Sequence, residues 1–548
     1  MNVIARSAGY SLLSLFLGLF LSLPLNASSE YAGSTACADC HSSEHEQWQN
    51  SHHSKAMQAA AVDTVLGDFA NVSVDFHNIK SRFFVKNDQY QIETTNKDGQ
   101  QEIFNVIYTF GFEPLQQYIL DTGNGHLQAF NIAWDSRDAS IGGQRWFHLQ
   151  PDIEMTEDHP FFWQRHFQNW NSRCAECHTT GFEKNYDTDT HTYHSGFAES
   201  NVGCESCHGP GQAHIDQLKD KQLDANKGFS TRLEATPLFQ YAENDPIANL
   251  SGETNTQYMQ QCAFCHSRRL TLGRSDNGAI QADQYEKQFH NEHSLSLLDS
   301  ELYFDDGQIK DEVFVIGSFL QSKMAHAGVS CSNCHNPHSG NVTLSANTVC
   351  SQCHLPEEFD TPEHHFHAAG STDTNVASPL CVDCHMPART YMQVDDRRDH
   401  SFIIPSANVS EVTGSPNVCL ECHIEKDLNW VEQTLQQHYG SEHSRPPLAE
   451  TIHWSNIHTL VDAEKIVFTR ERLGDQSPIV DAKLLSIINT RPTQESVSLA
   501  IEQLKAPSPL VRRAAIDVLS QLPPETMVNF VVPLLDDPIQ SVRFQAAA

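Results

Sequence analysis

The sequence predicts a mainly α-helical fold with little regular structure, interrupted by a small antiparallel β insertion and followed by a helical-repeat array. Three observations in the 548-residue chain lead to this prediction. Cysteine motifs crowd the middle of the chain, runs of alternating residues fill one long gap between motifs, and a proline-containing segment recurs near the end. Each observation predicts one part of the fold.

All sixteen cysteines fall into eight copies of Cys-x-x-Cys-His, and none is left over. This is the attachment motif of c-type haem, in which both sulfurs bind the porphyrin and the histidine binds the iron. Zinc is the alternative, because Cys-x-x-Cys pairs also build tetrahedral sites, but zinc would not need a histidine after every second cysteine. Only 39% of the residues are hydrophobic. We therefore expect eight covalently bound haem c groups, with iron, to form a multihaem core.

The motifs are numbered from first to eighth in chain order. The predicted attachment residues are Cys37 and Cys40, Cys174 and Cys177, Cys204 and Cys207, Cys262 and Cys265, Cys331 and Cys334, Cys350 and Cys353, Cys381 and Cys384, and Cys419 and Cys422. The predicted proximal iron ligands are His41, His178, His208, His266, His335, His354, His385 and His423.

A secretory signal peptide is expected at residues 1–27. Arg6 precedes an apolar run from Leu12 to Leu25, and a small-residue cleavage site follows. A signal anchor is the competing interpretation, but the run is short for a bilayer span and no stop-transfer pattern follows it. The mature chain is expected to be exported to the periplasm and not to cross a membrane itself.

The chain carries 69 acidic and 35 basic side chains, a formal net charge of −34. Such a charge argues against nucleic acid as a partner. The expected partners are periplasmic or membrane-attached redox proteins, and a basic one would be steered to this surface. In the alternative interpretation, the acidic side chains only keep the protein soluble, which explains the same composition.

An octahaem cytochrome domain is expected over residues 28–426. About 130 residues separate the first motif from the second, whereas the other seven are crowded between Cys174 and His423. Within this gap, aromatic and β-branched runs alternate with turn residues, which predicts a β-rich insertion at about 74–150. Short helices are expected from Ser42 to Ala61 and from Val313 to His326.

The C-terminal part contains a repeat with a step of 31 residues. The repeated segments are Ser477-Pro478-Ile479-Val480, Ser508-Pro509-Leu510-Val511, and Asp537-Pro538 before Val542-Arg543. Each opens an amphipathic helix, and the step fits a helical-hairpin solenoid resembling short HEAT repeats. An ordinary helical tail is the alternative. We expect a helical linker over 427–475 and repeats over 476–548, truncated within the last helix and available to a protein partner.

The first three motifs resemble the tetrahaem cytochrome c554 family, the electron acceptor of hydroxylamine oxidation. The first motif is followed by Trp48 and by the run His52-His53-Ser54-Lys55-Ala56-Met57, as at the opening of that family. The second is followed by Gly181-Phe182, and the third lies in the more specific run from Gly203 to Gly211. The resemblance covers about the first half of the chain apart from the β insertion. It implies stacked and perpendicular haem pairs, with His53 bound to a haem distant in sequence.

The fifth and sixth motifs resemble the doubled haem-binding motif of many multihaem cytochromes. In that family the histidine after the proline and one shortly before the pair commonly bind iron on the distal side, which corresponds to His338 and His326. The chain has 31 histidines, enough for a distal ligand at every haem. The predicted distal ligands are His53, His214, His326, His338 and His400.

The cytochrome c554 resemblance also implies that the haem of the second motif is five-coordinate. The β insertion directly precedes this motif, and four of its side chains are candidates for the roof of a distal pocket: Tyr108, Arg145, Trp146 and His148. In the alternative interpretation, the arginine contacts a haem propionate and the aromatic side chains form the core of the insertion.

Two classes of function follow. The first is an electron-transfer cytochrome with mostly bis-histidine haems, and the alternative is an octahaem oxidoreductase of hydroxylamine, nitrite or sulfur oxyanions at one open haem. Nitrite- and tetrathionate-reducing octahaem enzymes generally replace the active haem's proximal histidine with lysine, and this sequence has no Cys-x-x-Cys-Lys. Electron transfer is therefore the favoured prediction. Partner binding through the C-terminal repeats is compatible with either.

Overall fold

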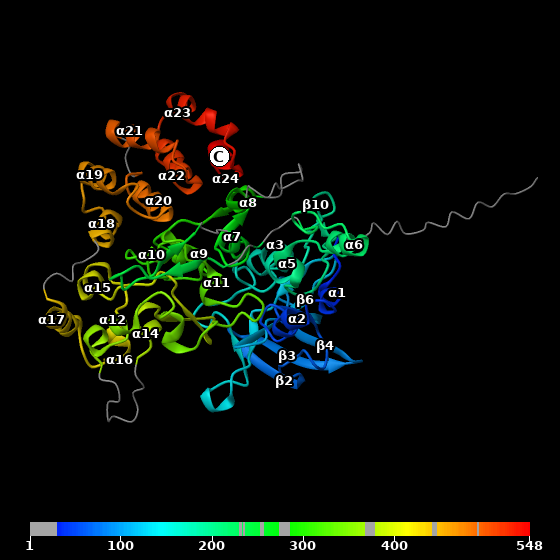
Figure 1. The fold of residues 1–548 in the computed structure, drawn as a ribbon. Coiled ribbons are helices and arrows are strands. Elements are labelled where there is room, and N and C mark those ends of the chain that lie inside the picture. Colours follow the sequence, from blue (N-terminus) through cyan, green and yellow to red (C-terminus); the bar gives the residue numbers. More distant parts are fainter. Residues whose placement is uncertain are drawn as a thin grey trace, which may run out of the picture.

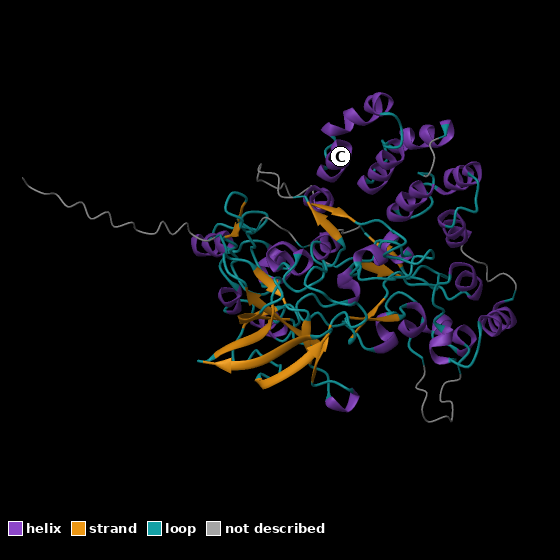
Figure 2. Ribbon diagram, turned by 180° about the vertical axis from the view of Figure 1, so that it is seen from behind, coloured by secondary structure: helices purple, strands orange, loops and turns teal. Residues whose placement is uncertain are grey.

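The chain forms an antiparallel sheet in its N-terminal part, short helices and hairpins in the middle, and a helical array at its C-terminal end (Figure 1). The computed structural model describes residues 30–229, 233, 236–252, 257–272, 285–367, 379–440, 447–489 and 493–548. The predicted signal peptide lies outside the described residues. Figure 2 shows the sheet and the C-terminal helices at opposite ends of the molecule.

The N-terminal sheet has nine strands in the order β2-β3-β4-β5-β6-β8-β9, with β1 paired to β5 and β7 to β6. All of these pairs are antiparallel. The strands are β1 (Met57–Ala59), β2 (Ala70–Phe76), β3 (Ile79–Lys86), β4 (Gln89–Thr95), β5 (Gln101–Phe110), β6 (Leu115–Asp121), β7 (Leu127–Ala129), β8 (Ile132–Asp135) and β9 (Arg145–His148).

The sheet encloses an aromatic core of its own. Phe83 stacks on Trp146 with ring centroids 3.7 Å apart, and buried Phe130 lies edge-on to Trp163 at 5.5 Å. The indole nitrogen of Trp163 donates a hydrogen bond of 2.9 Å to the carbonyl oxygen of Thr95. Aromatic burial of this kind stabilises the sheet without any contribution from a prosthetic group.

The predicted fold class, mainly α with a small β insertion, is wrong. The structure is 37% helix and 19% strand, and the antiparallel sheet is large and nearly closed. Strand β6 is buried at nearly every position, so its sequence lacks the two-residue period that marks a half-buried strand. Strand β1 falls inside a segment that the sequence predicts to be helical.

Both predicted helices of the middle part are shorter in the structure. The segment from Ser42 to Ala61 forms only α2 (Ser42–Gln49) before the chain turns into β1. At this turn the hydroxyl of Ser51 donates to the carbonyl oxygen of Trp48 at 2.6 Å, and such bonds compete with helix propagation. The segment from Val313 to His326 forms two separate turns, α9 (Ile316–Phe319) and α10 (Lys323–His326).

The remaining helices of the middle part are short, and several carry a cysteine motif. They are α1 (Ser34–Ala38), α3 (Trp170–Arg173), α4 (Ala175–His178), α5 (Cys204–His208), α6 (Gln212–Asp220), α7 (Gln257–Ala263), α8 (Tyr285–Glu292), α11 (Cys331–Cys334), α12 (Pro356–Phe359), α13 (Pro362–His365), α14 (Cys381–His385), α15 (Ala407–Thr413) and α16 (Cys419–Cys422). The described residues of the middle part also form two-stranded antiparallel sheets: β10 (Tyr186–Asp187) with β11 (Thr192–Tyr193), β12 (Leu238–Gln240) with β13 (Asn249–Ser251), β14 (Arg269–Thr271) with β15 (His293–Leu295), and β16 (Ala388–Tyr391) with β17 (Asp395–Arg398).

The C-terminal array begins after the last motif. Its helices are α17 (Leu428–Tyr439), α18 (Pro447–Asn456), α19 (Asp462–Arg472), α20 (Pro478–Ile487), α21 (Gln494–Gln503), α22 (Pro509–Leu519), α23 (Pro524–Val531) and α24 (Gln540–Ala547). Helices α20, α22 and α24 begin at the predicted step of 31 residues. Proline opens α20 and α22, a position where its missing N–H costs nothing.

The C-terminal helices pack directly onto the middle part of the chain. Leu295 and Tyr303 belong to the same buried cluster as Leu484 and Leu519 of the array. The guanidinium of Arg513 also donates to the carbonyl oxygen of Leu295 at 3.1 Å. The array is therefore an integral part of this structure. Among the described residues, no helix is both long enough and apolar enough to span a bilayer.

Candidate haem-binding cavity

A cavity of about 4850 Å³ runs through the middle part of the chain. Ordinary small-molecule pockets measure roughly 300–1,000 Å³, so this cavity has room for several large groups. Its walls carry cysteines of every motif from the second to the eighth. The volume and this lining fit covalently bound haem.

Most of the motifs form a turn of helix that brings the histidine back to the first cysteine. In five motifs the backbone N–H of the histidine donates to the carbonyl oxygen of the first cysteine at 2.9 to 3.0 Å, which closes one helical turn. These histidines are His41, His266, His335, His354 and His423. All sixteen cysteines are described, and none of them forms a disulfide.

Cysteine sulfurs of different motifs lie next to each other. The first motif contacts the third, the second contacts the fourth, the fourth contacts the fifth, and the sixth contacts the seventh. The thiol pairs within hydrogen-bonding reach are Cys37 with Cys204, Cys177 with Cys265, Cys262 with Cys331, and Cys350 with Cys381. Motifs far apart in sequence are thus direct neighbours in space.

Hydrogen bonds join the first, third and fourth motifs. The carboxylate of Glu205, in the third motif, accepts from the backbone N–H groups of Ala32 and Gly33 at 2.7 and 2.8 Å. The amide nitrogen of Gln261, beside the fourth motif, donates to the carbonyl oxygen of Ser206 at 2.9 Å. The third motif therefore lies between the first and the fourth.

The fifth, sixth and seventh motifs are joined in the same way. The amide nitrogen of Gln352, in the sixth motif, donates to the carbonyl oxygen of Asn333 in the fifth at 3.2 Å. The backbone N–H of Cys381 donates to the side-chain oxygen of Asn347, just before the sixth motif, at 2.9 Å. These bonds continue the series beyond the fourth motif.

The eighth motif adjoins the seventh. Arg398 of β17 lies between them, because it donates to the carboxylate of Asp383, in the seventh motif, at 3.0 Å and its charge also acts on Glu421 of the eighth. Burial raises the pKa of the Cys384 thiol to about 11, and the nearby Cys419 of the eighth motif contributes to the same shift. The spatial order is therefore first, third, fourth, fifth, sixth, seventh and eighth, with the second motif as a branch at the fourth.

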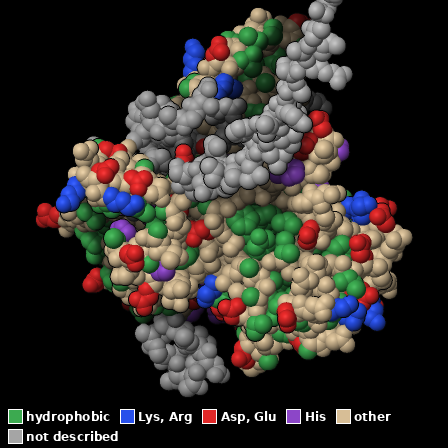
Figure 3. Space-filling model, turned by 90° about the vertical axis from the view of Figure 1, so that its right-hand side faces the viewer, with side chains coloured by type: hydrophobic (Ala, Val, Ile, Leu, Met, Phe, Trp, Pro, Cys, Tyr) green, Lys and Arg blue, Asp and Glu red, His purple; other side chains and the backbone are tan. Residues whose placement is uncertain are grey.

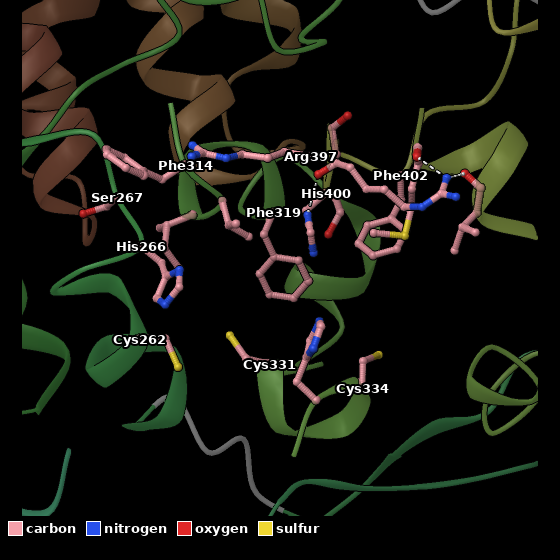
Figure 4. Close-up of a pocket in the computed structure, with 18 of the residues that line it drawn as sticks. Cys262, His266, Ser267, Phe314, Phe319, Cys331, Cys334, Arg397, His400 and Phe402 are labelled. Carbon is pink, nitrogen blue, oxygen red and sulfur yellow. Dashed lines mark hydrogen bonds between the residues drawn. The ribbon is translucent and has the colours of Figure 1, made fainter. Parts of the chain in front are cut away.

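The fourth motif is the junction of this series. Burial lowers the pKa of His266 to about 4, and His53, His335, His400 and His178 lower it further by charge repulsion. Two of these, His178 and His335, are the motif histidines of the second and fifth motifs. Figure 4 shows the sulfurs of Cys262 and Cys331 turned toward each other, with His266 and His400 pointing into the same pocket.

Five of the motif histidines lie close to a second histidine ring. The ring centroids are 6.3 Å apart for His266 and His53, 6.5 Å for His208 and His338, 6.4 Å for His335 and His400, 6.1 Å for His385 and His364, and 6.1 Å for His423 and His367. A metal–imidazole bond measures about 2.0–2.1 Å, so two imidazoles on one ion place their ring centres roughly 6 Å apart. These spacings fit one iron between each pair.

Three predicted distal ligands belong to these pairs, and two do not. His53, His338 and His400 each face a motif histidine. The ring of His214 lies on Phe229, and its Nδ1 is 2.7 Å from the carbonyl oxygen of Lys227. His326 ends α10, and no histidine ring of the described residues is paired with it in this way.

His364 and His367 face the seventh and eighth motif histidines but are not among the predicted distal ligands. The available signal was the run His364-His365-Phe366-His367, shortly before the seventh motif. Three histidines within four residues are unusual for a surface segment, because this side chain commonly serves as a metal ligand.

The histidines of the first, second and sixth motifs have no such partner among the described rings. His178 lies against Phe110 with ring centroids 4.0 Å apart, and its Nδ1 is 3.2 Å from the carbonyl oxygen of Ala56. Burial lowers the pKa of His178 to about 4, which keeps the ring neutral and able to bind a metal. The ring of His354 lies edge-on to Phe359 at 5.4 Å.

Of the four side chains considered for a roof over the second motif, only one packs beside it. Tyr108 belongs to the same apolar cluster as Cys174 and stacks on Trp170 at 6.4 Å. Trp146 lies in the core of the sheet, and His148 is buried beside His77 with ring centroids 4.9 Å apart. Arg145 is paired with Asp135 at 3.7 Å.

Two known solved structures are similar to this chain. The outer cell wall cytochrome OcwA is 16% identical, with a TM-score of 0.47 over 90% of this chain and 100% of that chain. The octahaem sulfite reductase MccA of Wolinella succinogenes is 12% identical, with a TM-score of 0.30 over 95% of this chain and 83% of that chain. Both TM-scores are below 0.5, so these similarities establish neither the fold nor the function of this chain. No curated protein matches the sequence.

Two family models match parts of the chain. The model for cytochrome c554 and c-prime matches residues 36–82 and 152–209, so the match stops within the sheet and resumes after it. The model for HEAT repeats matches residues 466–548. Both predicted resemblances are thereby confirmed. The chain therefore resembles the cytochrome c554 family in two segments of its first half, and its last helices resemble HEAT repeats.

Proposed function

We propose that the protein is an octahaem electron-transfer cytochrome, with one haem c at each of its eight motifs. The cysteines of each motif hold the group through thioether bonds, and the motif histidine binds iron on the proximal side. Bound haem c supplies a reversible one-electron couple at iron. The observation that supports this proposal best is that the motifs lie next to one another in a continuous spatial order. Haems held side by side in this way can pass electrons from one to the next.

Paired histidines support bis-histidine ligation at five of the motifs. Under this proposal the distal ligands are His53, His338, His400, His364 and His367, donated to the fourth, third, fifth, seventh and eighth motifs. Two histidines fill both axial positions of an iron, so these sites would relay electrons without binding a substrate. His214 and His326 stay predictions without such support.

The proposal places the mature protein outside the cytoplasm, where it would exchange electrons with periplasmic or membrane-attached redox proteins. The expected signal peptide and the net charge of −34 support this placement and a partner with a basic surface. The face in Figure 3 presents both acidic and basic side chains, interspersed with hydrophobic ones.

A mass spectrum of the denatured holoprotein tests the haem count. We expect eight covalent haem adducts, because each of the eight motifs has two cysteines followed by a histidine. Fewer than eight adducts after efficient maturation would contradict the proposal. Replacing the two cysteines of any one motif with serine should lower the count by one, which ties each adduct to a motif.

Catalysis at an open haem is the second candidate function. The observation in its favour is that His178, in the second motif, faces Phe110 rather than another histidine. A site with an empty distal position admits a small nitrogen or sulfur compound, whereas a bis-histidine site does not. The resemblance to the cytochrome c554 family implies an open haem at this same motif.

Cyanide or nitric oxide separates the two candidates. Either ligand is expected to change the spectrum of one haem only, and the change should disappear when Cys174 and Cys177 are replaced by serine. If neither ligand alters the spectrum of the wild-type protein, no iron is open and catalysis is excluded. A positive result calls for turnover assays with hydroxylamine, nitrite and sulfite.

A further inference from the structure

We propose that Arg269 is a positioning residue that locks the second motif to the fourth and fixes the spacing between the groups they hold. This inference rests on the proposed function, because it needs haem at both motifs. It concerns the contact between the second motif, the branch of the series, and the fourth motif, its junction.

One guanidinium group contacts both motifs. Its Nε donates to the carbonyl oxygen of Phe264, within the fourth motif, at 2.7 Å. Its Nη2 donates to the carboxylate of Glu176, within the second motif, at 3.1 Å and lies 3.7 Å from the sulfur of Cys177. Because these donors belong to one rigid plane, the arginine fixes the relative position of two short helices.

A threonine completes this lock. Nη1 of Arg269 donates to the hydroxyl of Thr271 at 2.7 Å, and that hydroxyl donates to the same oxygen of Glu176 at 3.0 Å. The carboxylate of Glu176 thus receives one hydrogen bond from the guanidinium and one from the threonine hydroxyl. Charge-assisted bonds of this kind are about twice as strong as neutral ones.

The arginine is buried and its backbone is held in place. Only 8% of its side chain is exposed, so solvent screens its charge much less than it would at the surface. Arg269 begins β14 and pairs with Leu295 of β15, which is buried among the HEAT helices. The thiols of Cys177 and Cys265 lie within hydrogen-bonding reach beside it. The lock therefore lies beside one haem-attachment cysteine of each motif.

Two effects of Arg269 can be separated. Its position fixes the distance between the two irons, which sets the magnetic interaction between them. Its positive charge disfavours the oxidised, more positive state of both irons, which raises their reduction potentials. Arg269→Lys keeps the charge but removes the planar fork, whereas Arg269→Gln removes both.

The experiment uses the full-length holoprotein, with EPR spectra recorded during a potentiometric titration. In Arg269→Lys the magnetic interaction between the two haems is expected to weaken while their potentials stay near those of the wild type. In Arg269→Gln the magnetic interaction should weaken too, and the reduction potentials of both haems should fall. The expected fall is about 59 mV for each one-electron couple, which corresponds to a roughly tenfold smaller equilibrium constant for reduction. Thr271→Val removes the hydroxyl that bonds to both Arg269 and Glu176, so it should also weaken the magnetic interaction. This variant replaces Arg269→Gln in the experiment if the Gln variant does not incorporate its haems.

Arg268→Gln is the matched control. Arg268 is adjacent and carries the same charge, but its guanidinium donates to the carbonyl oxygen of Glu312 at 3.3 Å instead of joining two motifs. It should keep the wild-type interaction. The proposal is overturned if the wild type has no such interaction, if Arg269→Lys and Thr271→Val both retain it, or if Arg268→Gln loses it equally. The adduct count of the wild type tests the proposed function separately, since it does not depend on Arg269.

Discussion

Replacing Cys262 and Cys265 of the fourth motif with serine is expected to divide the protein into separately reducible groups of haem. The fourth motif contacts the second through Cys265 and the fifth through Cys262, and Gln261 beside it bonds to the third. Losing its haem would leave the first and third motifs on one side, the fifth to eighth on the other, and the second alone. Electron equilibration after photoreduction of part of the haems should change from one rapid phase to slow, separate phases.

The matched control is the same double substitution at the second motif, Cys174 and Cys177. This variant also loses one haem and leaves a similar void, but the second motif is a branch, so the main series stays intact. Rapid equilibration among the seven remaining haems is expected. If the two variants equilibrate equally fast, or both become slow, the proposed order of the motifs is wrong.

Stability should fall in both variants. Removing a large buried aromatic side chain costs about 3–5 kcal/mol, partly because a cavity remains, and a haem is larger than any side chain. The cysteines of the second to eighth motifs line one cavity of about 4850 Å³, so a lost haem would leave part of this cavity unfilled. The sheet has a core of its own, so its near-ultraviolet circular dichroism should persist when a haem is missing.

The motifs were predictable because their chemistry is local. Five residues specify two sulfurs and an imidazole, and one helical turn suffices to bring them together, as the bond from the N–H of His266 to the carbonyl oxygen of Cys262 illustrates. The repeats were predictable for a similar reason, since a step of 31 residues is visible in the sequence alone. Neither depends on which distant segments come together.

The sheet and the histidine pairs depend on long-range contacts, and the sequence predicted them less well. Met57 looks like the end of a helix until its pairing with Phe110, in β5, is known. His53 was selected because a family resemblance marked it, and its partner His266 lies in a motif that this resemblance does not cover. No family motif includes His364 and His367, and only the folded structure places them beside motif histidines.

Replacing both His364 and His367 with alanine is expected to convert two low-spin haems to high spin. Their rings lie 6.1 Å from those of His385 and His423, the spacing that fits an iron between two imidazoles. Loss of an axial imidazole removes a strong ligand and should raise the potential of each affected iron. Compared with the wild type, EPR of the oxidised double variant should show two additional high-spin signals, and each single variant should show one.

His438→Ala is the control for this experiment, because the same cavity is lined by His438 but its ring stacks on Phe366 at 4.0 Å and faces no motif histidine. It should keep every low-spin signal. Free imidazole added to the double variant should restore the low-spin spectrum, since it can occupy the vacated positions. A double variant that stays entirely low-spin would show that other residues bind these irons, and the series would then end in sites with a different ligand set.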